Sequence, residues 1–181
     1  MMRWTRFSCG FAAAVLLLIG CGSATNTLSG SIRVSDSALN YQRALSFCKE
    51  ATPDICSEDS IVLPLTDRDA LSQVRKAFRN EYDGATCGAG WMGRAFSDVS
   101  QGADVVVRNG EDDIIASSSL GAGTYRTPGL MTDAYCEYAF TLDVTDTGFY
   151  QLVIGNRDAP LYSYEELVEQ GWLVELSLSS R

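Results

Sequence analysis

The chain has 181 residues, of which 46% are hydrophobic and 20% charged, a formal net charge of −9 and no histidine. This composition is typical of one globular domain and excludes a wholly disordered chain. The negative charge argues against nucleic acid as a partner. Without histidine, Ser-His-Asp catalysis, Cys-His catalysis and histidine-ligated metal sites are excluded.

The first twenty residues have the pattern of a bacterial lipoprotein signal peptide. Arg3 and Arg6 precede the apolar run 11–19, which is too short to span a bilayer as a stable helix. The residues Leu-Ile-Gly-Cys that end at Cys21 resemble the lipobox, in which the cysteine receives a diacylglyceryl group and becomes the new N-terminus. The sequence therefore predicts a signal peptide over 1–20 and lipidation of Cys21.

Lipidation sets the expected location and partners. Two acyl chains, such as palmitate, give stable membrane attachment. We therefore expect a protein anchored on the extracytoplasmic face of the cell membrane. Residues 21–30, which after Cys21 are small, polar and uncharged, are expected to form a lipidated tether to a single folded domain over 31–181.

The first part of the domain combines one strand with helices. Residues 31–36 alternate as a short strand. Residues 39–48 fit either a helix or an irregular strand, and their periodicity does not decide between the two. Residues 67–80 place their apolar side chains on one helical stripe, with Thr66 or Asp67 available as the N-cap.

The second part of the domain is richer in strands. Residues 102–109 and 114–120 are expected to form a hairpin through a type I′ turn at Asn109-Gly110. Further strands are expected over 136–144, 149–155 and 172–180, and the first of these alternates cleanly between apolar and polar residues.

Short strands separated by turns indicate a mainly β protein. We predict an antiparallel β-sandwich of the prealbumin or immunoglobulin type, with a helical insertion around 39–81. Ser163-Tyr-Glu-Glu166 is a capping box, so a short helix is expected near 165–170 that ends at Gly171.

The cysteines predict disulfides. Cys9 lies in the signal peptide and Cys21 is assigned to lipid, which leaves Cys48, Cys56, Cys87 and Cys136. An even number in an exported chain indicates two disulfides with three possible connectivities. We favour Cys48–Cys56 and Cys87–Cys136. A four-thiolate metal site is disfavoured, because no C-x-x-C pair is present and exported thiols oxidise.

Residues 87–178 resemble a family of small actinobacterial lipoproteins of uncharacterised function. The elements that carry the resemblance are Cys87-Gly88-x-Gly90, Phe96-Ser-Asp98-Val, Gly102-Ala-Asp-Val-Val-Val, Leu120-Gly-Ala-Gly123, Cys136-Glu-Tyr-Ala-Phe140, Tyr150-Gln-Leu-Val-Ile-Gly-Asn-Arg157, and Tyr162-Ser-Tyr-Glu-Glu with Leu176-Ser-Leu. The resemblance implies a bond between Cys87 and Cys136, and it implies no activity.

A glycine motif and two acidic turns are the patterns that could carry chemistry. Residues 88–93 match G-x-G-x-x-G, but a glycine loop with tight turns explains them better than a dinucleotide site, because no strand–loop–helix unit surrounds them. The acidic turns at 111–113 and 143–146 contain oxygen ligands of the kind calcium uses, but no D-x-D-x-D-G loop is present. We therefore predict neither a cofactor nor a metal.

The sequence contains no recognisable catalytic constellation. We expect a non-catalytic binding or interaction module for an envelope protein or a glycan. The alternative is a cell-envelope glycan hydrolase that uses paired carboxylates, a chemistry that requires no histidine.

Overall fold

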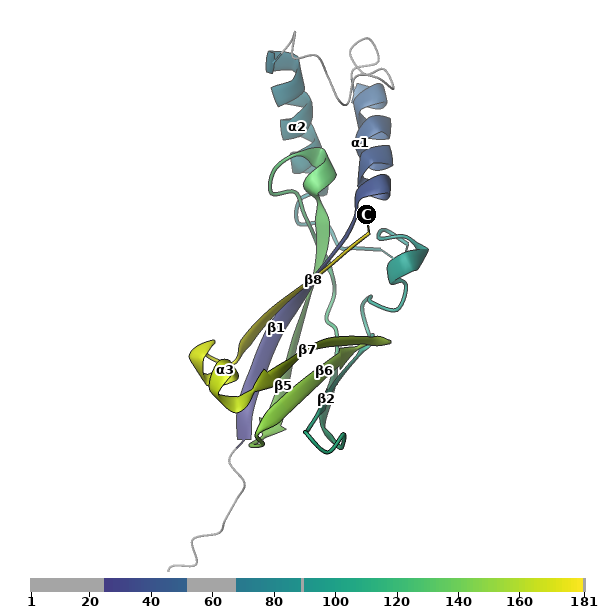
Figure 1. Ribbon diagram of the computed structural model, residues 1–181. Coiled ribbons are helices and arrows are strands. Elements are labelled where there is room, and N and C mark those ends of the chain that lie inside the picture. Colours follow the sequence, from purple (N-terminus) through teal and green to yellow (C-terminus); the bar gives the residue numbers. More distant parts are fainter. Residues whose placement is uncertain (1–24, 52–67, 89, 181) are drawn as a thin grey trace, which may run out of the picture.

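The computed structural model of the protein describes residues 25–51, 68–88 and 90–180, and it is mainly β (Figure 1). Two four-stranded sheets enclose one hydrophobic core. The first sheet has the order β4-β5-β1-β8, with β4 Thr124–Arg126, β5 Tyr135–Thr145, β1 Thr25–Asp36 and β8 Leu173–Ser180. The second has the order β3-β2-β6-β7, with β3 Ile114–Ser119, β2 Asp104–Arg108, β6 Phe149–Ile154 and β7 Arg157–Ser163.

Strand β1 is longer than the sequence pattern indicated. It begins at Thr25, so the part of the expected tether from Thr25 to Gly30 belongs to the sandwich instead. Leu28 is fully buried and Gly30 faces the ring of Phe140. These contacts explain why this glycine-containing segment packs against the core instead of extending into solvent. The prediction of a tether over 21–30 is therefore wrong for its second half.

Strand β1 also has two kinds of neighbour. It pairs antiparallel with β5 from Thr25↔Thr145 to Val34↔Cys136, and parallel with β8 from Ser29↔Leu173 to Asp36↔Ser180. The sandwich therefore differs from the expected antiparallel one in this single parallel pair among the described strands. The other strand pairs are antiparallel.

The alternation predicted for β5 is confirmed. Its inward residues Cys136, Tyr138, Phe140 and Leu142 are buried, whereas Ala139, Thr141 and Asp143 are exposed. Because successive side chains of a strand point to opposite faces, this pattern places one face of the first sheet against the core.

The β2–β3 hairpin forms, but its turn differs from the expected type I′ turn. The positive φ lies at Asp112 (67°) rather than at Asn109 or Gly110. The Asn109 carboxamide oxygen accepts hydrogen bonds from the backbone N–H groups of Glu111 and Asp113, both at 2.9 Å. These side-chain bonds favour a longer turn over 109–113, since an asparagine side chain can substitute for a backbone partner.

The helical insertion is confirmed as a hairpin of two helices, α1 Ser37–Ala51 and α2 Arg68–Tyr82. Residues 39–48, left open by the sequence, are helical. Helix α1 follows β1 directly, and the Asp36 carboxylate caps it by accepting a hydrogen bond from the Leu39 N–H at 3.1 Å. The expected α2 caps, Thr66 and Asp67, lie outside the described residues.

The short third helix is also confirmed. Helix α3 spans Tyr164–Glu169, and Ser163 and Glu166 form the predicted capping box. Gly171 adopts a positive φ of 63° just after the helix, the conformation that glycine tolerates best.

One predicted disulfide is present. Cys87 and Cys136 are bonded with a Cα–Cα distance of 6.1 Å across 49 residues of sequence. Cys48 is also disulfide-bonded, but its expected partner Cys56 lies outside the described residues, so the pairing of these two stays a prediction. Cys21 and the whole signal segment lie outside them as well.

Candidate functional site

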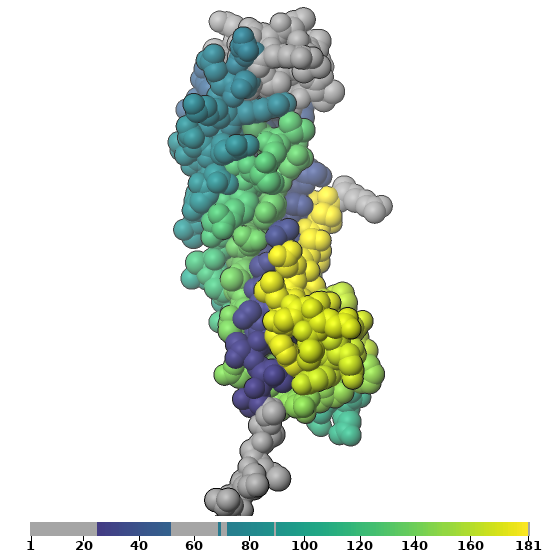
Figure 2. Space-filling model, turned by 90° about the vertical axis from the view of Figure 1, so that its left-hand side faces the viewer, coloured from purple at the N-terminus to yellow at the C-terminus, as the bar shows by residue number. Residues whose placement is uncertain are grey.

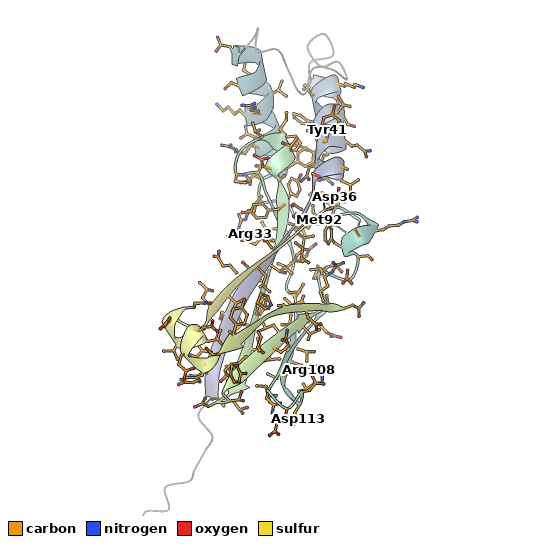
Figure 3. All side chains as sticks on the ribbon, viewed as in Figure 1. Arg33, Asp36, Tyr41, Met92, Arg108 and Asp113 are labelled. Atoms are coloured by element: carbon orange, nitrogen blue, oxygen red, sulfur yellow. A yellow bond between two sulfur atoms is a disulfide. The ribbon has the colours of Figure 1, made fainter. Side chains whose placement is uncertain are left out.

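The helical hairpin stands at one end of the elongated molecule, and the start of β1 lies at the other (Figures 1 and 2). The β2–β3 turn, marked by Arg108 and Asp113, lies at the same end as the start of β1 (Figure 3). Asp36 and Tyr41 mark the start of α1, from which the hairpin extends away from the sheets (Figure 3). Among the described residues, the hairpin is therefore the part farthest from Thr25, where β1 begins.

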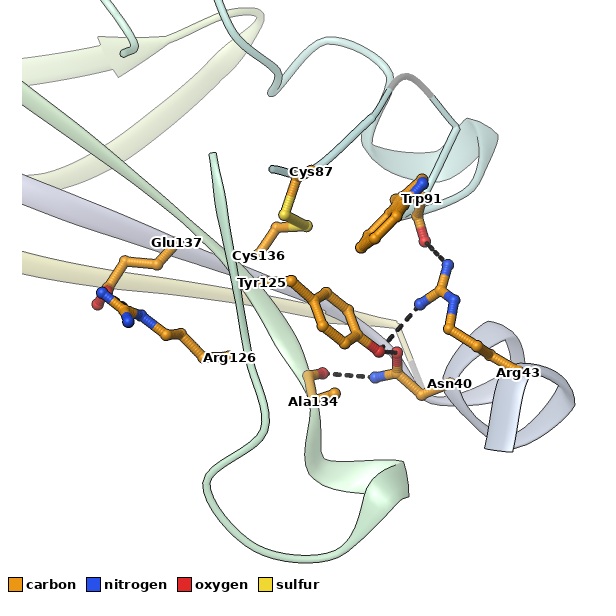
Figure 4. The surroundings of a disulfide bond; sticks show 9 residues. All are labelled: Asn40, Arg43, Cys87, Trp91, Tyr125, Arg126, Ala134, Cys136 and Glu137. Atoms are coloured by element: carbon orange, nitrogen blue, oxygen red, sulfur yellow. Dashed lines mark hydrogen bonds and ion pairs between the residues drawn. A yellow bond between two sulfur atoms is a disulfide. The ribbon is translucent and has the colours of Figure 1, made fainter. Parts of the chain in front are cut away.

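A polar network fixes α1 to the sandwich next to the Cys87–Cys136 disulfide (Figure 4). Asn40 is fully buried, and its amide donates to the Ala134 carbonyl. The Tyr125 hydroxyl donates to the Asn40 carboxamide oxygen at 3.2 Å. Burial raises the pKa of Tyr125, so this phenol stays neutral.

Arg43 completes this network. Its guanidinium donates to the Tyr125 hydroxyl at 3.0 Å and to the Trp91 carbonyl at 3.2 Å, and it lies over both rings. The Arg43 guanidinium therefore stabilises the base of the hairpin through these contacts. We assign it a structural role.

Helix α2 packs on α1 through aromatic side chains. The rings of Phe78 and Phe47 meet edge to face with centroids 5.3 Å apart, and Tyr82 contacts Phe47, Phe78, Trp91 and Tyr125. The buried Val74 lies one turn from Phe78, on the stripe predicted from the sequence. This packing turns the opposite face of α2 outward.

That outward face borders an open groove of about 770 Å³. Its lining residues are Ser72, Arg75, Lys76, Arg79, Asn80, Gly129, Leu130 and Asp133. Figure 2 shows the two walls side by side, with α2 in teal and the segment after β4 in green. We call this the α2 groove.

The second wall of the groove is held rigidly. The Asp83 carboxylate accepts hydrogen bonds from the Thr127 N–H at 2.8 Å and the Thr127 hydroxyl at 3.1 Å, which ties the end of α2 to the chain after β4. The Asp133 carboxylate accepts from the Leu130 N–H at 3.2 Å. The groove is therefore preformed.

The three cations of the α2 groove differ from most others in the part of the chain described. Arg33, Arg108, Arg126 and Arg157 each form an ion pair with a carboxylate. Arg75, Lys76 and Arg79 have no ion pair among the described residues, although Asp133 lines the same groove. Arg94, on the short 3₁₀ helix Arg94–Phe96, also has no ion pair or side-chain hydrogen bond among the described residues.

The patterns singled out in the sequence do not assemble into this site. Gly90 and Gly93 adopt positive φ values of 84° and 70°, which fits the interpretation of a tight glycine loop. The carboxylate of Asp112 lies 3.3 Å from Arg108, and no group of three potential metal ligands occurs among the described residues. In the described part, no helix is long and apolar enough to cross a membrane.

One pair of carboxylates does share a groove. Asp158 of β7 and Glu175 of β8 both line an opening of about 300 Å³ between the edges of the two sheets. Glu175 lies 3.5 Å from the Arg33 guanidinium. Among the described residues, this pair is a candidate for a carboxylate-dependent hydrolase mechanism.

The fold and site define a mainly β protein of two four-stranded sheets that carries a helical hairpin with a basic outer face. Comparison with family models, with curated proteins and with solved structures found no match. The resemblance of residues 87–178 to the actinobacterial lipoproteins therefore stays a prediction.

Sequence reasoning did not single out the α2 groove. The signal was present, because residues 72–80 contain three basic and no acidic residues within a chain of net charge −9. The opposite wall comes from residues 129–133, about fifty positions away in the sequence, and no local pattern joins the two.

Proposed function

We propose that the protein is a lipid-anchored extracytoplasmic envelope protein whose helical hairpin is a non-catalytic binding module. The observation that supports this most is the direction of β1. Its first residue, Thr25, is four positions after the lipobox cysteine Cys21 and lies at the end opposite the hairpin. Four residues reach at most about 14 Å, so the sandwich would stand close to the lipid.

The same geometry would present the hairpin away from the membrane. The 12 residues of β1 span about 40 Å, and the 15 residues of α1 about 22 Å. The two elements follow one another without a loop, so the Ala51 end of α1 would stand up to about 60 Å from Thr25, which is itself close to the anchor. A module at that distance can reach partners beyond the membrane surface.

The anchor is tested by labelling cells with radioactive palmitate and separating their membranes. We expect the wild-type protein to be labelled and to sediment with membranes, and a Cys21→Ser variant to lose both properties. Cys9→Ser is the matched control, because Cys9 lies in the segment expected to be removed. Membrane retention of the Cys21→Ser protein would refute the anchor.

The binding role is tested with a photo-crosslinking amino acid placed at Ser72 on α2 or at Ser119 on β3, both of which are exposed. In intact cells we expect a crosslinked product from position 72 and none from position 119. Both positions are exposed serines in the wild-type protein, so a difference in crosslinking between them reflects their different locations on the molecule. Equal crosslinking from both, or none from position 72, would contradict a binding module at the hairpin.

The second candidate function is a glycan hydrolase, favoured by the shared groove of Asp158 and Glu175. Hydrolysis by two carboxylates needs one as general acid and the other as base or nucleophile. We expect Asp158→Asn and Glu175→Gln each to abolish any release of soluble fragments from purified cell walls. Activity that survives both substitutions would remove this candidate.

A further inference from the structure

We propose that Arg75, Lys76 and Arg79 in the α2 groove bind an anionic polysaccharide, a chain in which phosphodiester or carboxylate groups repeat along a sugar or polyol backbone. This inference rests on the proposed function, since it names the partner of the same hairpin. The α2 groove is the proposed binding site. Polymers with phosphodiester groups and polymers with carboxylate groups share the property that matters for this site, a negative charge repeated along the chain.

The arrangement of the three cations supports a repeating anion. Arg75 and Arg79 are four positions apart on α2, so they are neighbours on one face with an axial spacing of about 6 Å. Like charges at this spacing destabilise a helix. Because none of the three has an ion pair among the described residues, the stability of α2 gives no reason for this cluster, whereas a ligand with closely spaced anions does.

The rest of the groove favours a polysaccharide over an acidic protein. Ser72 and Asn80 offer a hydroxyl and an amide that can hydrogen-bond to sugar hydroxyls. Protein interfaces depend on buried aromatic or large apolar anchors, and the lining offers only Leu130, which is 46% exposed. Asp133 also lines the groove, but its carboxylate already accepts a hydrogen bond from the Leu130 N–H.

The charge of the remaining molecule supports the same assignment. Residues 104–175 contain 3 basic and 13 acidic residues, a net charge of −10. A polyanion is therefore repelled by most of the sandwich and attracted to α2. The distance of α2 from the proposed anchor argues against the lipid surface as the natural anion, because electrostatic attraction to a membrane is screened within about 8 Å at physiological salt.

The experiment measures binding of the full lipidated protein in detergent to end-labelled polymers by fluorescence anisotropy. The probes are poly(glycerol phosphate), polygalacturonate, neutral dextran and poly-L-glutamate. We expect one or both anionic polysaccharides to bind and dextran not to bind. The preferred polymer distinguishes a phosphodiester from a carboxylate ligand.

The decisive variant is Arg75→Gln/Lys76→Gln/Arg79→Gln, because glutamine keeps a good helix propensity while removing the charge. We expect the affinity of this variant to fall about tenfold or more. Wild-type binding should also weaken when the ionic strength rises from about 0.01 M to about 0.15 M, because the Debye length then shortens from about 30 Å to about 8 Å. Arg94→Gln is the matched control, since it removes a cation outside α2 that has no ion pair among the described residues. Its affinity should stay within about twofold, as expected for a charge far from the ligand. Circular dichroism verifies that each variant is folded.

Three results would overturn the inference: wild-type protein that binds no anionic polysaccharide, a triple variant that is folded and binds as well as wild type, or tighter binding of poly-L-glutamate than of either polysaccharide. Failure of the proposed function is recognised separately, through membrane retention of the Cys21→Ser protein or crosslinking that does not depend on position 72.

Discussion

Replacing both cysteines of the Cys87–Cys136 disulfide with alanine should destabilise the protein strongly. The bridge closes a loop with a sequence separation of 49 residues. The loop-closure model then gives a loss of about 4 kcal/mol at 25 °C, because the unfolded chain regains the entropy that the bridge had removed. Both sulfurs belong to buried residues, Cys136 at 0% and Cys87 at 6% exposure, so lost packing would add to this loss.

The assay is urea unfolding followed by tryptophan fluorescence, in parallel with thermal unfolding. For a domain of this size, a loss of about 4 kcal/mol corresponds to a decrease in Tm of about 8–16 °C. Wild-type protein with reduced disulfides is the control, because it keeps the sulfur atoms and loses only the cross-links. A Cys87→Ala/Cys136→Ala protein whose unfolding free energy falls by less than about 1 kcal/mol would refute the reasoning.

Three further predictions follow from single contacts. Asn40→Ala leaves the Ala134 carbonyl and the Tyr125 hydroxyl without their buried partner, and should lower the unfolding free energy by about 1–3 kcal/mol in urea titrations. Gly123→Ala would place a Cβ 2.3 Å from the Tyr138 ring, and should cost about 1–3 kcal/mol in the same assay. Asp98→Asn should flatten the acid limb of the stability–pH profile. The hydrogen bond from the Arg157 guanidinium lowers the pKa of Asp98, so its contribution is present above the ordinary pKa near 3.8 and disappears as pH falls through the lower folded value.

A matched control separates the steric effect of Gly123→Ala from a general sensitivity to mutation. Gly148→Ala adds a Cβ that meets nothing within 4 Å and should leave stability within about 1 kcal/mol of wild type. If Gly148→Ala costs as much as Gly123→Ala, or if Asp98→Asn leaves the acid limb unchanged, the corresponding explanation is wrong.

The parts of the fold that were predicted correctly have strong local signals. The strict alternation of β5 and the capping box at Ser163 each act within a few residues, so the sequence displays them directly. The sequence pattern does not identify helix α1, because its buried positions are Asn40, Ala44 and Cys48, which give little hydrophobic periodicity. The polar network that buries Asn40 comes from distant segments.

The missed strands have a different cause. β4 is only three residues long, and β7 is an edge strand that contains Pro160 and a register shift opposite β6. Proline in a strand argues against a central position and weakens a local assignment. The parallel pairing of β1 with β8 joins residues more than 140 positions apart, which no local pattern could indicate.

The position of β1 has a mechanical consequence. It forms ten residue pairs with β5 and eight with β8, and it leads without a loop into α1. If the N-terminal end is held and the hairpin is pulled, the force acts along the strand, so these two ladders are loaded in shear and many hydrogen bonds must break together. Peeling a strand from its end breaks them one at a time and needs less force. The protein is therefore built to resist tension along its long axis.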